Sequence, residues 1–309
     1  MRLAIFGTGG VGGYFGGRLA QAGQDVTFIA RGRHLAQMRE SGLWVDSIGG
    51  DFVVKPAKAT DSPQSVGEVD CVILAVKAWQ LNEAIEAMKS LIGSETAILP
   101  LMNGIEHIDL LADAFEEKHV LGGLCRISSF LAGPGHITHV GMKPFISFGE
   151  LDNSKSGRVK GLLEIFSSLG GIDVDVPPDI RAAMWEKFIF ICSTSGVGAV
   201  TRQPMGVFRS VPESRALLES AIKEALEIGR VKGVALSGEL LETLMNRIDG
   251  LPADMVASMQ KDIMEGRPSE LEAQTGVAVR MGHALGVPTP THEFIYASLL
   301  PMELKARGS

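Results

Sequence analysis

The chain has 309 residues, a formal net charge of -7 and 45% hydrophobic residues. This length is long for one hydrophobic core, so we expect two domains, and the net negative charge argues against nucleic acid as a partner. No apolar run reaches the roughly 18 residues of a membrane span, so we expect no membrane contact, and the first predicted strand begins at Arg2, which leaves no room for a signal peptide.

A glycine-rich turn stands between the first predicted strand and helix. Residues 2–6 form a short apolar run, residues 11–22 form a helix of small residues, and residues 25–30 form a β-branched and aromatic strand. In this strand–helix–strand order, G-x-G-x-x-G spacing indicates a dinucleotide-binding site of the Rossmann type. The alternative, a glycine turn without a ligand, is disfavoured because all three elements are in place.

Each glycine of the turn has a physical role. Gly7 allows the tight turn, Gly9 lets the backbone approach a pyrophosphate, and Gly12 lets the helix pack closely on the strand. The amino end of the helix then faces the phosphates. The predicted cofactor-binding residues of the turn are Gly7, Gly9, Gly10, Val11 and Gly12.

Arg31 stands where sites that prefer NAD carry an acidic residue. An Asp or Glu about 20 residues after the glycines normally accepts hydrogen bonds from the ribose 2'-hydroxyl. Here residues 30–33 read ARGR. A guanidinium can form a forked pair of hydrogen bonds with a 2'-phosphate, so we predict NADP (NADPH) as the cofactor. The alternative is a solvated charge at the end of a strand.

The chain then alternates strands and helices to about residue 170. The expected elements are a helix at 35–40, a hairpin at 43–60, a buried strand at 70–80, a helix at 81–93, a strand that runs into a loop over 96–107 and further strands at 119–151. Beyond Pro177 and Pro178 the pattern becomes helical, with segments from 180 and at 213–232, 237–248, 253–264 and 268–285.

These patterns predict an α/β, doubly wound sheet followed by an all-helical domain. We place the limits at 1–178 for the NADP-binding domain and 179–309 for the helical domain, where we expect substrate to bind and any homodimer to form. Cys71, Cys125 and Cys192 are scattered in apolar stretches without the spacing of metal ligands. We therefore expect reduced packing cysteines in a cytoplasmic protein that holds no metal.

Three polar residues follow apolar runs, at expected carboxyl ends of strands, where ligands bind in open α/β sheets. They are Lys77, Asn103 and Arg126. Lys77 could support the cofactor phosphates or ribose, and the Asn103 amide could bond substrate or nicotinamide ribose. The alternatives are a solvated lysine and an ordinary Asn-Gly turn.

Two sites in the helical half could carry chemistry. Lys187 leads into the apolar run 188–192, so its ammonium must either extend to solvent or lie near a polar cavity, where its pKa falls and proton transfer becomes feasible. Glu270 and Glu272 lie on opposite sides of one expected helical turn, so one can face inward. An exposed Glu186-Lys187 pair and a helix-dipole role for the glutamates are the alternatives.

Several short motifs in the right order resemble the ketopantoate reductase (2-dehydropantoate 2-reductase) family over nearly the whole chain. The motifs are GTGGVGG at the start, Arg31, Lys77 in AVKAWQ, Asn103 in MNG, Lys187 in WEK, and Ser258 with Glu270 in SMQKDIMEGRPSEL. The resemblance implies that NADPH reduces a 2-oxo acid, with Lys187 and Glu270 as catalytic residues. It implies that Ser258 binds the substrate carboxylate, that Glu270 anchors a substrate hydroxyl, and that Asn103 assists substrate and cofactor.

The implied reaction is the reduction of 2-dehydropantoate (ketopantoate) to pantoate, a step of pantothenate biosynthesis. The chain departs from the family pattern where asparagines are expected, at Ile191, Ser195, Met205 and Met255. These departures leave two alternatives open: a reductase of a related branched 2-oxo acid, and a non-catalytic NADP-binding sensor.

Overall fold

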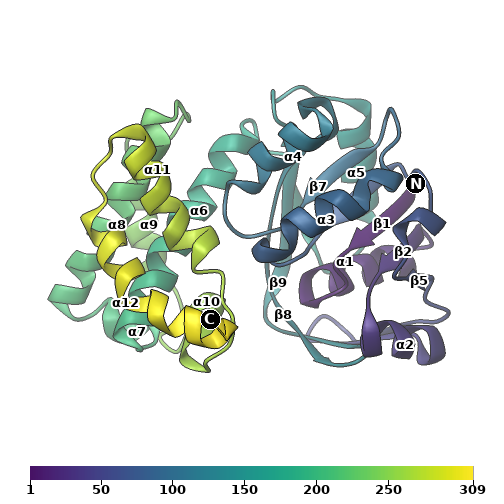
Figure 1. Ribbon diagram of the computed structural model, residues 1–309, viewed down its shortest axis with the longest axis horizontal. Coiled ribbons are helices and arrows are strands. Elements are labelled where there is room, and N and C mark those ends of the chain that lie inside the picture. The colour runs from purple at the N-terminus through teal and green to yellow at the C-terminus, as the bar shows by residue number, and fades with distance from the viewer. Residues whose placement is uncertain (309) are drawn as a thin grey trace. The chain divides into compact units, whose positions relative to one another are not determined.

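The computed structural model describes residues 1–308, which fall into two compact units (Figure 1). The first unit comprises Met1–Met102 and His107–Ile180. The second comprises Asn103–Glu106 and the chain from Arg181 onward. The segment Asn103–Glu106 follows strand β7 (Ala97–Pro100) of the first unit but groups with the helical unit. The domain limits expected from the sequence placed this segment in the first domain.

The first unit is built on a parallel sheet that is buried on both faces, as expected of doubly wound strands. The strand order is β5-β2-β1-β6-β7. The strands are β1 (Arg2–Phe6), β2 (Asp25–Ile29), β5 (Ala59–Thr60), β6 (Cys71–Leu74) and β7 (Ala97–Pro100). Its helices are α1 (Gly10–Gln21), α2 (Gly32–Ser41), α3 (Leu81–Met88), α4 (His107–Phe115) and α5 (Gly157–Ser168). The predicted fold class is confirmed for this half.

A second sheet completes the first unit. Its order is β10-β9-β3-β4, with β8 paired to β9. The strands are β3 (Leu43–Ser47), β4 (Phe52–Val54), β8 (Leu121–Gly133), β9 (His136–Glu150) and β10 (Asp173–Asp175). The predicted hairpin is confirmed, because β3 and β4 pair antiparallel. The placement of Arg126 at a strand end was wrong, since Arg126 lies inside β8 opposite Phe145 and stacks on that ring at 4.1 Å.

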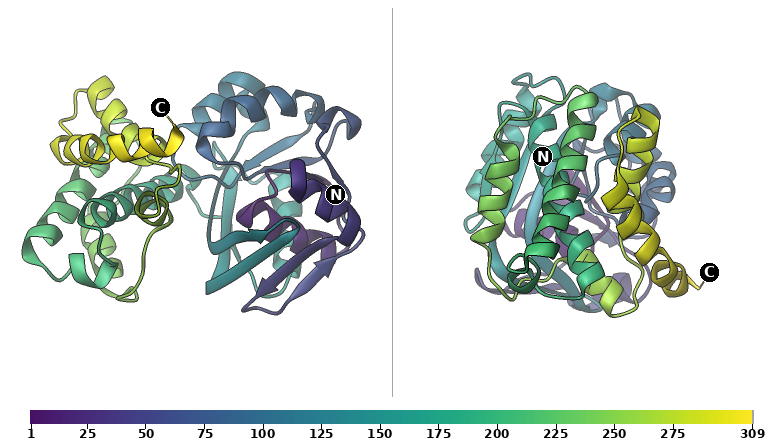
Figure 2. Two further views of the ribbon diagram at one scale, coloured as in Figure 1. Left: turned by 60° about the horizontal axis from the view of Figure 1, so that its bottom comes forward. Right: turned by 90° about the vertical axis from the view of Figure 1, so that its left-hand side faces the viewer.

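The second unit is helical, as predicted. Its helices are α6 (Ile180–Thr201), α7 (Met205–Phe208), α8 (Pro212–Val231), α9 (Leu240–Asp249), α10 (Ser258–Met264), α11 (Val277–Leu285) and α12 (Pro290–Arg307). Helix α8 packs against α9, α11 and α12 (Figure 2). The helix expected at 268–285 begins only at Glu272, with a π-helical turn over Glu272–Gly276. Helix α12, which contains Pro301, was not predicted.

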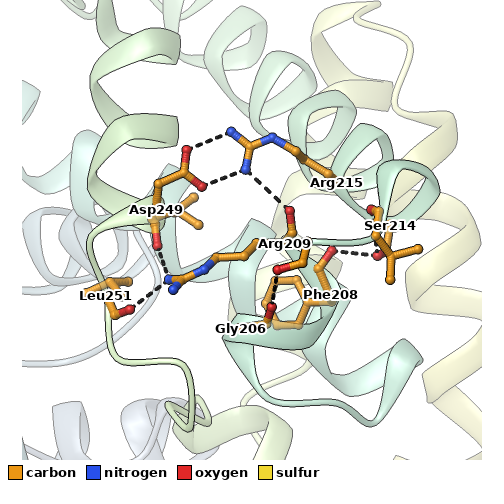
Figure 3. A network of polar contacts seen from close by, with 10 residues as sticks. Gly206, Phe208, Arg209, Ser214, Arg215, Asp249 and Leu251 are labelled. Atoms are coloured by element: carbon orange, nitrogen blue, oxygen red, sulfur yellow. Dashed lines mark hydrogen bonds and ion pairs between the residues drawn. The ribbon is translucent and has the colours of Figure 1, made fainter.

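Polar interactions hold the chain that leads from α9 to α10. Arg209 Nη1 donates to the carbonyl oxygens of Ile248 at 2.6 Å and Leu251 at 2.8 Å. Arg215 forms a bidentate ion pair with Asp249 at 2.6 and 2.8 Å (Figure 3). Arg209 therefore joins the last turn of α9 to the chain that follows it, adding a second donor to the Ile248 carbonyl, which already accepts from Leu251 N at 3.2 Å.

We expect the two arginines of this network to differ in their contribution to stability. Arg209→Met removes both donors from the main-chain carbonyls and should lower the free energy of unfolding by about 1 to 3 kcal/mol. Arg215→Met removes a pair whose side chains are 35% and 45% exposed, so its cost should stay below about 1 kcal/mol. Urea unfolding of both variants measures the difference, and equal losses would contradict the assignment.

A carboxylate on α8 binds the start of α12. Glu224 accepts hydrogen bonds from Thr291 N at 2.7 Å, His292 N at 3.0 Å and His292 Nδ1 at 2.8 Å. Burial is the largest single influence on Glu224 and opposes ionisation. Together, however, the hydrogen bonds outweigh burial and lower the pKa of Glu224 below its ordinary value of 4.5.

The stabilisation from Glu224 should therefore depend on pH. A carboxylate with a lowered folded-state pKa stabilises the fold fully above its unfolded value, near 4.5, and loses this effect as the pH falls through the folded pKa. We expect Glu224→Gln to cost about 1 to 3 kcal/mol of unfolding free energy at neutral pH. The difference from wild type should shrink as the pH falls below 4.5. Denaturant unfolding of wild type and Glu224→Gln across this pH range tests the prediction. A difference in unfolding free energy that does not change with pH would refute it.

Within residues 1–308, no helix is long and apolar enough to cross a membrane. The three cysteines are free and buried, as predicted.

Candidate active site

The parallel sheet aligns the ends of three neighbouring strands. Phe6 at the end of β1 is in register with Ile29 of β2 and with Leu74 of β6. The glycine turn, Arg31 and Lys77 each follow one of these residues within about three positions, so all three emerge at one edge of the sheet. This is the edge at which open α/β sheets bind ligands.

The glycine turn has the geometry that close approach to a ligand requires. Gly7 has φ +95°, and a Cβ atom there would lie 2.8 Å from the Ala75 main chain. A Cβ on Gly12 would lie 2.1 Å from the Gly7 oxygen, whereas one on Gly9 would meet nothing within 4 Å. Thr8 Oγ1 donates to Ile29 O at 3.0 Å and holds the turn against β2. Gly7 and Gly12 are thus needed for packing, and Gly9 leaves open space before the amino end of α1.

Gly10 and Val11 begin helix α1 and are half-buried. A Cβ on Gly10 would lie 2.3 Å from Ser129 O in β8, so this glycine also serves the packing of α1 on the second sheet. The first main-chain N–H groups of α1 lie at this end of the helix, and α1 has no side-chain cap. An anion is a suitable partner for such groups.

Arg31 precedes helix α2 in extended conformation and forms an ion pair that the sequence did not indicate. Its Nη1 lies 2.5 Å from Glu83 Oε1 of α3, and the two side chains are 58% and 62% exposed. A carboxylate therefore does stand near the residue proposed to bind a 2'-phosphate. Glu83 is 52 residues away in the chain, so no local spacing could have revealed it.

Lys77 is exposed and follows β6 at the start of a 3-10 turn, Ala78–Gln80. Its Nζ lies 5.7 Å from the centre of the Trp79 ring, which is 43% exposed. Lys77 N donates to Gln80 Oε1 at 3.2 Å, which fixes the turn. The lysine thus stands at the same sheet edge as the glycine turn, beside an accessible aromatic ring.

The second unit brings together two of the predicted site residues. Asn103 Nδ2 donates to Glu270 Oε2 at 2.9 Å across 167 residues of sequence. Glu270 is 5% exposed, whereas the side chain of Glu272 is 47% exposed. The inward-facing glutamate is therefore Glu270, although it lies before the π-helical turn rather than within a helix.

Arg280 fixes the segment that carries Asn103. Its Nη2 donates to Glu106 Oε2 at 2.9 Å and its Nη1 to Glu272 Oε2 at 2.8 Å. Tyr296 also donates to Glu272, at 2.5 Å, and burial together with this carboxylate raises the Tyr296 pKa to about 12. No local sequence pattern indicated Arg280, because its role depends on contacts distant in sequence.

Lys187 lies on α6, next to the buried Phe188, and is half-buried, while Glu186 is exposed. The side chain of Lys187 is thus less exposed to solvent than that of Glu186. Ser258, the first residue of α10, is exposed. Lys187 and Ser258 stay predicted partners of a bound substrate.

The four departures from the family pattern lie in two places. Met205 N donates to Met255 O at 2.9 Å, so these two residues are adjacent, and Met205 is 2% exposed. Ser195 on α6 is 2% exposed and donates to Gln274 Oε1 of the π-helical turn at 2.6 Å. The carbonyl oxygen of Ile191, one turn earlier, lies beside the same hydroxyl, whose single proton the two acceptors share. Gln274 therefore brings an amide to the Ser195 position from another part of the chain.

Comparison with known proteins adds independent findings. The family model "Ketopantoate reductase PanE/ApbA" matches residues 3–153, and "Ketopantoate reductase PanE/ApbA C terminal" matches residues 179–303. "Uncharacterized oxidoreductase YkpB" of Bacillus subtilis (strain 168) is 32% identical over 299 residues, 97% of this chain and 98% of that protein.

Two further relatives have more specific names. A "2-dehydropantoate 2-reductase" of Mesorhizobium japonicum is 29% identical over 318 residues, 96% of each chain. The crystal structure of a PanE/ApbA family ketopantoate reductase from Ralstonia eutropha JMP134 superposes with a TM-score of 0.89 at 29% identity, covering 99% of this chain and 100% of that one. Fold and comparisons together define an oxidoreductase. The chain belongs to the ketopantoate reductase family.

Proposed function

We propose that the protein reduces 2-dehydropantoate to pantoate with NADPH, as a cytoplasmic step of pantothenate biosynthesis. The observation that carries the proposal is the contact of Asn103 with the buried Glu270 carboxylate at 2.9 Å. Glu270 has a second oxygen, and a buried carboxylate is a strong acceptor for a substrate hydroxyl. The names of the family and of several relatives support this choice of substrate.

The residues of the first unit fit a dinucleotide with a 2'-phosphate. Gly9 leaves space for the pyrophosphate before α1, Arg31 can pair with the 2'-phosphate, and Lys77 stands at the same edge. We propose residues 1–178 as the cofactor domain and 179–309 as the substrate domain, to which Asn103 is added by its contacts. When bound, NADPH supplies the hydride.

The residues of the second unit would bind and protonate the substrate. Lys187 Nζ would donate a hydrogen bond, and then a proton, to the ketone oxygen that becomes the product hydroxyl. Glu270 would accept a hydrogen bond from the substrate hydroxyl, and Ser258 Oγ would donate to the substrate carboxylate. Asn103 would orient Glu270 and contribute an amide to substrate or nicotinamide ribose.

A related 2-oxo acid with a plain apolar branch is the second candidate substrate. Ile191, Met205 and Met255 present apolar side chains where the resemblance leads us to expect amides. A substrate hydroxyl left without a partner costs about 1 to 3 kcal/mol. This candidate becomes the better one if Glu270 and Ser258 do not suffice to bind the hydroxyl and carboxylate.

One pair of substrates tests the proposal. NADPH oxidation is measured with ketopantoate and with its analogue in which the hydroxymethyl group is a methyl group. We expect kcat/KM to favour ketopantoate by more than about 100-fold, as in sites built to bond a substrate hydroxyl. Equal values would favour the second candidate. NADPH binding without oxidation across a panel of 2-oxo acids would identify a sensor instead.

A further inference from the structure

Helix α12 contributes a buried carboxylate to the peptide that carries Glu270. Glu303 is 2% exposed. Its two oxygens accept from the main-chain nitrogen of Ser269 at 3.1 and 3.0 Å, and Oε2 accepts from Ser269 Oγ at 2.6 Å. One turn further along α12, Arg307 Nε donates to Glu303 Oε1 at 2.6 Å. Glu303 is therefore held by one cation and one serine.

The same cluster fixes the chain on both sides of Glu270. Arg307 Nη2 donates to Ser269 O at 2.9 Å, and Leu271 N donates to Ser269 Oγ at 3.2 Å. Ser269 and Leu271 are both fully buried. The residue before Glu270 and the residue after it are thus tied, directly or through one hydroxyl, to a single carboxylate.

This restraint acts where regular secondary structure supplies little. Glu270 lies after the end of α10 at Met264 and before the π-helical turn that begins at Glu272. Its carbonyl oxygen accepts from Gln274 N at 3.0 Å, which restrains only the following side. The Glu303 cluster restrains the preceding side, so the Glu270 side chain departs from a peptide held at both ends.

The chemistry of Glu303 argues for more than packing. A carboxylate withdrawn from water is costly, and a paired buried charge often contributes no more stability than well-packed apolar side chains would. Three hydrogen bonds to one serine, however, define the position and direction of that serine's peptide. Binding sites need this kind of support, because an acceptor displaced by a fraction of an ångström bonds its ligand poorly.

We propose that Glu303 is a positioning residue that sets the selectivity of the enzyme for a hydroxylated substrate. It orients the Ser269–Leu271 peptide so that one Glu270 oxygen meets Asn103 and the other is available to the substrate hydroxyl. This inference rests on the proposed function of Glu270. Glu303 itself contacts neither substrate nor cofactor.

The test compares Glu303→Gln with wild type on ketopantoate and on the analogue that lacks the hydroxyl. We expect kcat/KM for ketopantoate to fall about 10- to 100-fold, mainly through KM, as is typical when a supporting partner of a site is altered. The value for the analogue should change little, so selectivity for the hydroxyl falls. A purely structural role would lower both values together.

Glu224→Gln is the matched control. Glu224 also accepts main-chain hydrogen bonds at α12, from Thr291 and His292, but at the opposite end of that helix from Glu303. The Glu224→Gln variant should be less stable than wild type but should keep the wild-type selectivity for ketopantoate over the analogue. Ser269→Ala and Ser269→Thr form a second pair: the alanine variant loses the hydroxyl link and should lose selectivity, whereas threonine retains the link and should restore it.

The outcomes separate the two proposals. If wild type prefers ketopantoate and folded Glu303→Gln keeps that preference, the positioning role is overturned and the proposed function stands. If wild type shows no preference for the hydroxyl, the proposed function of Glu270 fails and this inference fails with it. Should Glu303→Gln not fold, the Ser269 pair decides, and equal selectivity of its two members would overturn the inference.

Discussion

Lys187→Ala is expected to lower kcat for ketopantoate reduction at least 100-fold, because a general acid contributes about 100- to 10000-fold to the rate. Affinity for NADPH should barely change, since the glycine turn, Arg31 and Lys77, which are proposed to bind the cofactor phosphates, lie in the first unit. The rate of wild type should also fall at alkaline pH, where the ammonium loses its proton. This alkaline decline should be absent from the residual activity of the variant.

The neighbouring residue provides the control for this prediction. Glu186 is exposed while Lys187 is half-buried, so Glu186→Ala should retain activity close to wild type. Steady-state kinetics, a fluorescence titration with NADPH and thermal unfolding are measured for both variants. Loss of folding and of NADPH binding in Lys187→Ala would identify the lysine as a structural residue.

Arg31→Ala should weaken NADPH binding at least tenfold and leave NADH binding nearly unchanged. A charge-assisted contact with the 2'-phosphate contributes about 1.5 to 3 kcal/mol, and about 1.4 kcal/mol corresponds to a factor of ten. This contact competes with the ion pair of Arg31 and Glu83. Their pair is more than half exposed on both sides, so it contributes only about 0.2 to 1 kcal/mol and the phosphate should win.

Glu83→Gln reports on the same competition from the other side. Removing the carboxylate frees Arg31 and removes a like charge near the phosphate, so NADPH affinity should rise by up to about fivefold. Calorimetric titration of both cofactors into wild type and the two variants measures these effects. Equal affinity of wild type for NADPH and NADH would reject the role of Arg31.

Local sequence patterns predicted the elements whose cause is local. The apolar run before Gly7, the small residues after it and the next strand define a strand–turn–helix–strand unit by their own order and spacing, although β1 also pairs with β6 and α1 also packs on β8 and β9. The helical second half could be predicted in the same way, because residues 180–192 are apolar with few interruptions. The structure confirmed both.

Features that depend on residues far apart in the sequence could not be predicted from local patterns. Arg126 follows an apolar run that resembles a complete strand, but pairing with β9 extends β8 to Gly133. Helix α12 contains Pro301, a residue typical of helix ends, and is retained through its packing on α8. The partners of Arg31 and Glu270 lie 52 and 167 residues away. No spacing rule connects such residues before the chain has folded.

The grouping of Asn103–Glu106 with the helical unit has a consequence for recombination among relatives. The chain passes between the units after Met102, after Glu106 and after Ile180, so a single exchange near residue 178 separates Asn103 from the Glu270 that it contacts. A hybrid protein made at that one joint would inherit mismatched partners at Glu106 and Arg280 as well. If residues 103–106 are exchanged together with the C-terminal half, Asn103 and Glu106 keep their partners Glu270 and Arg280.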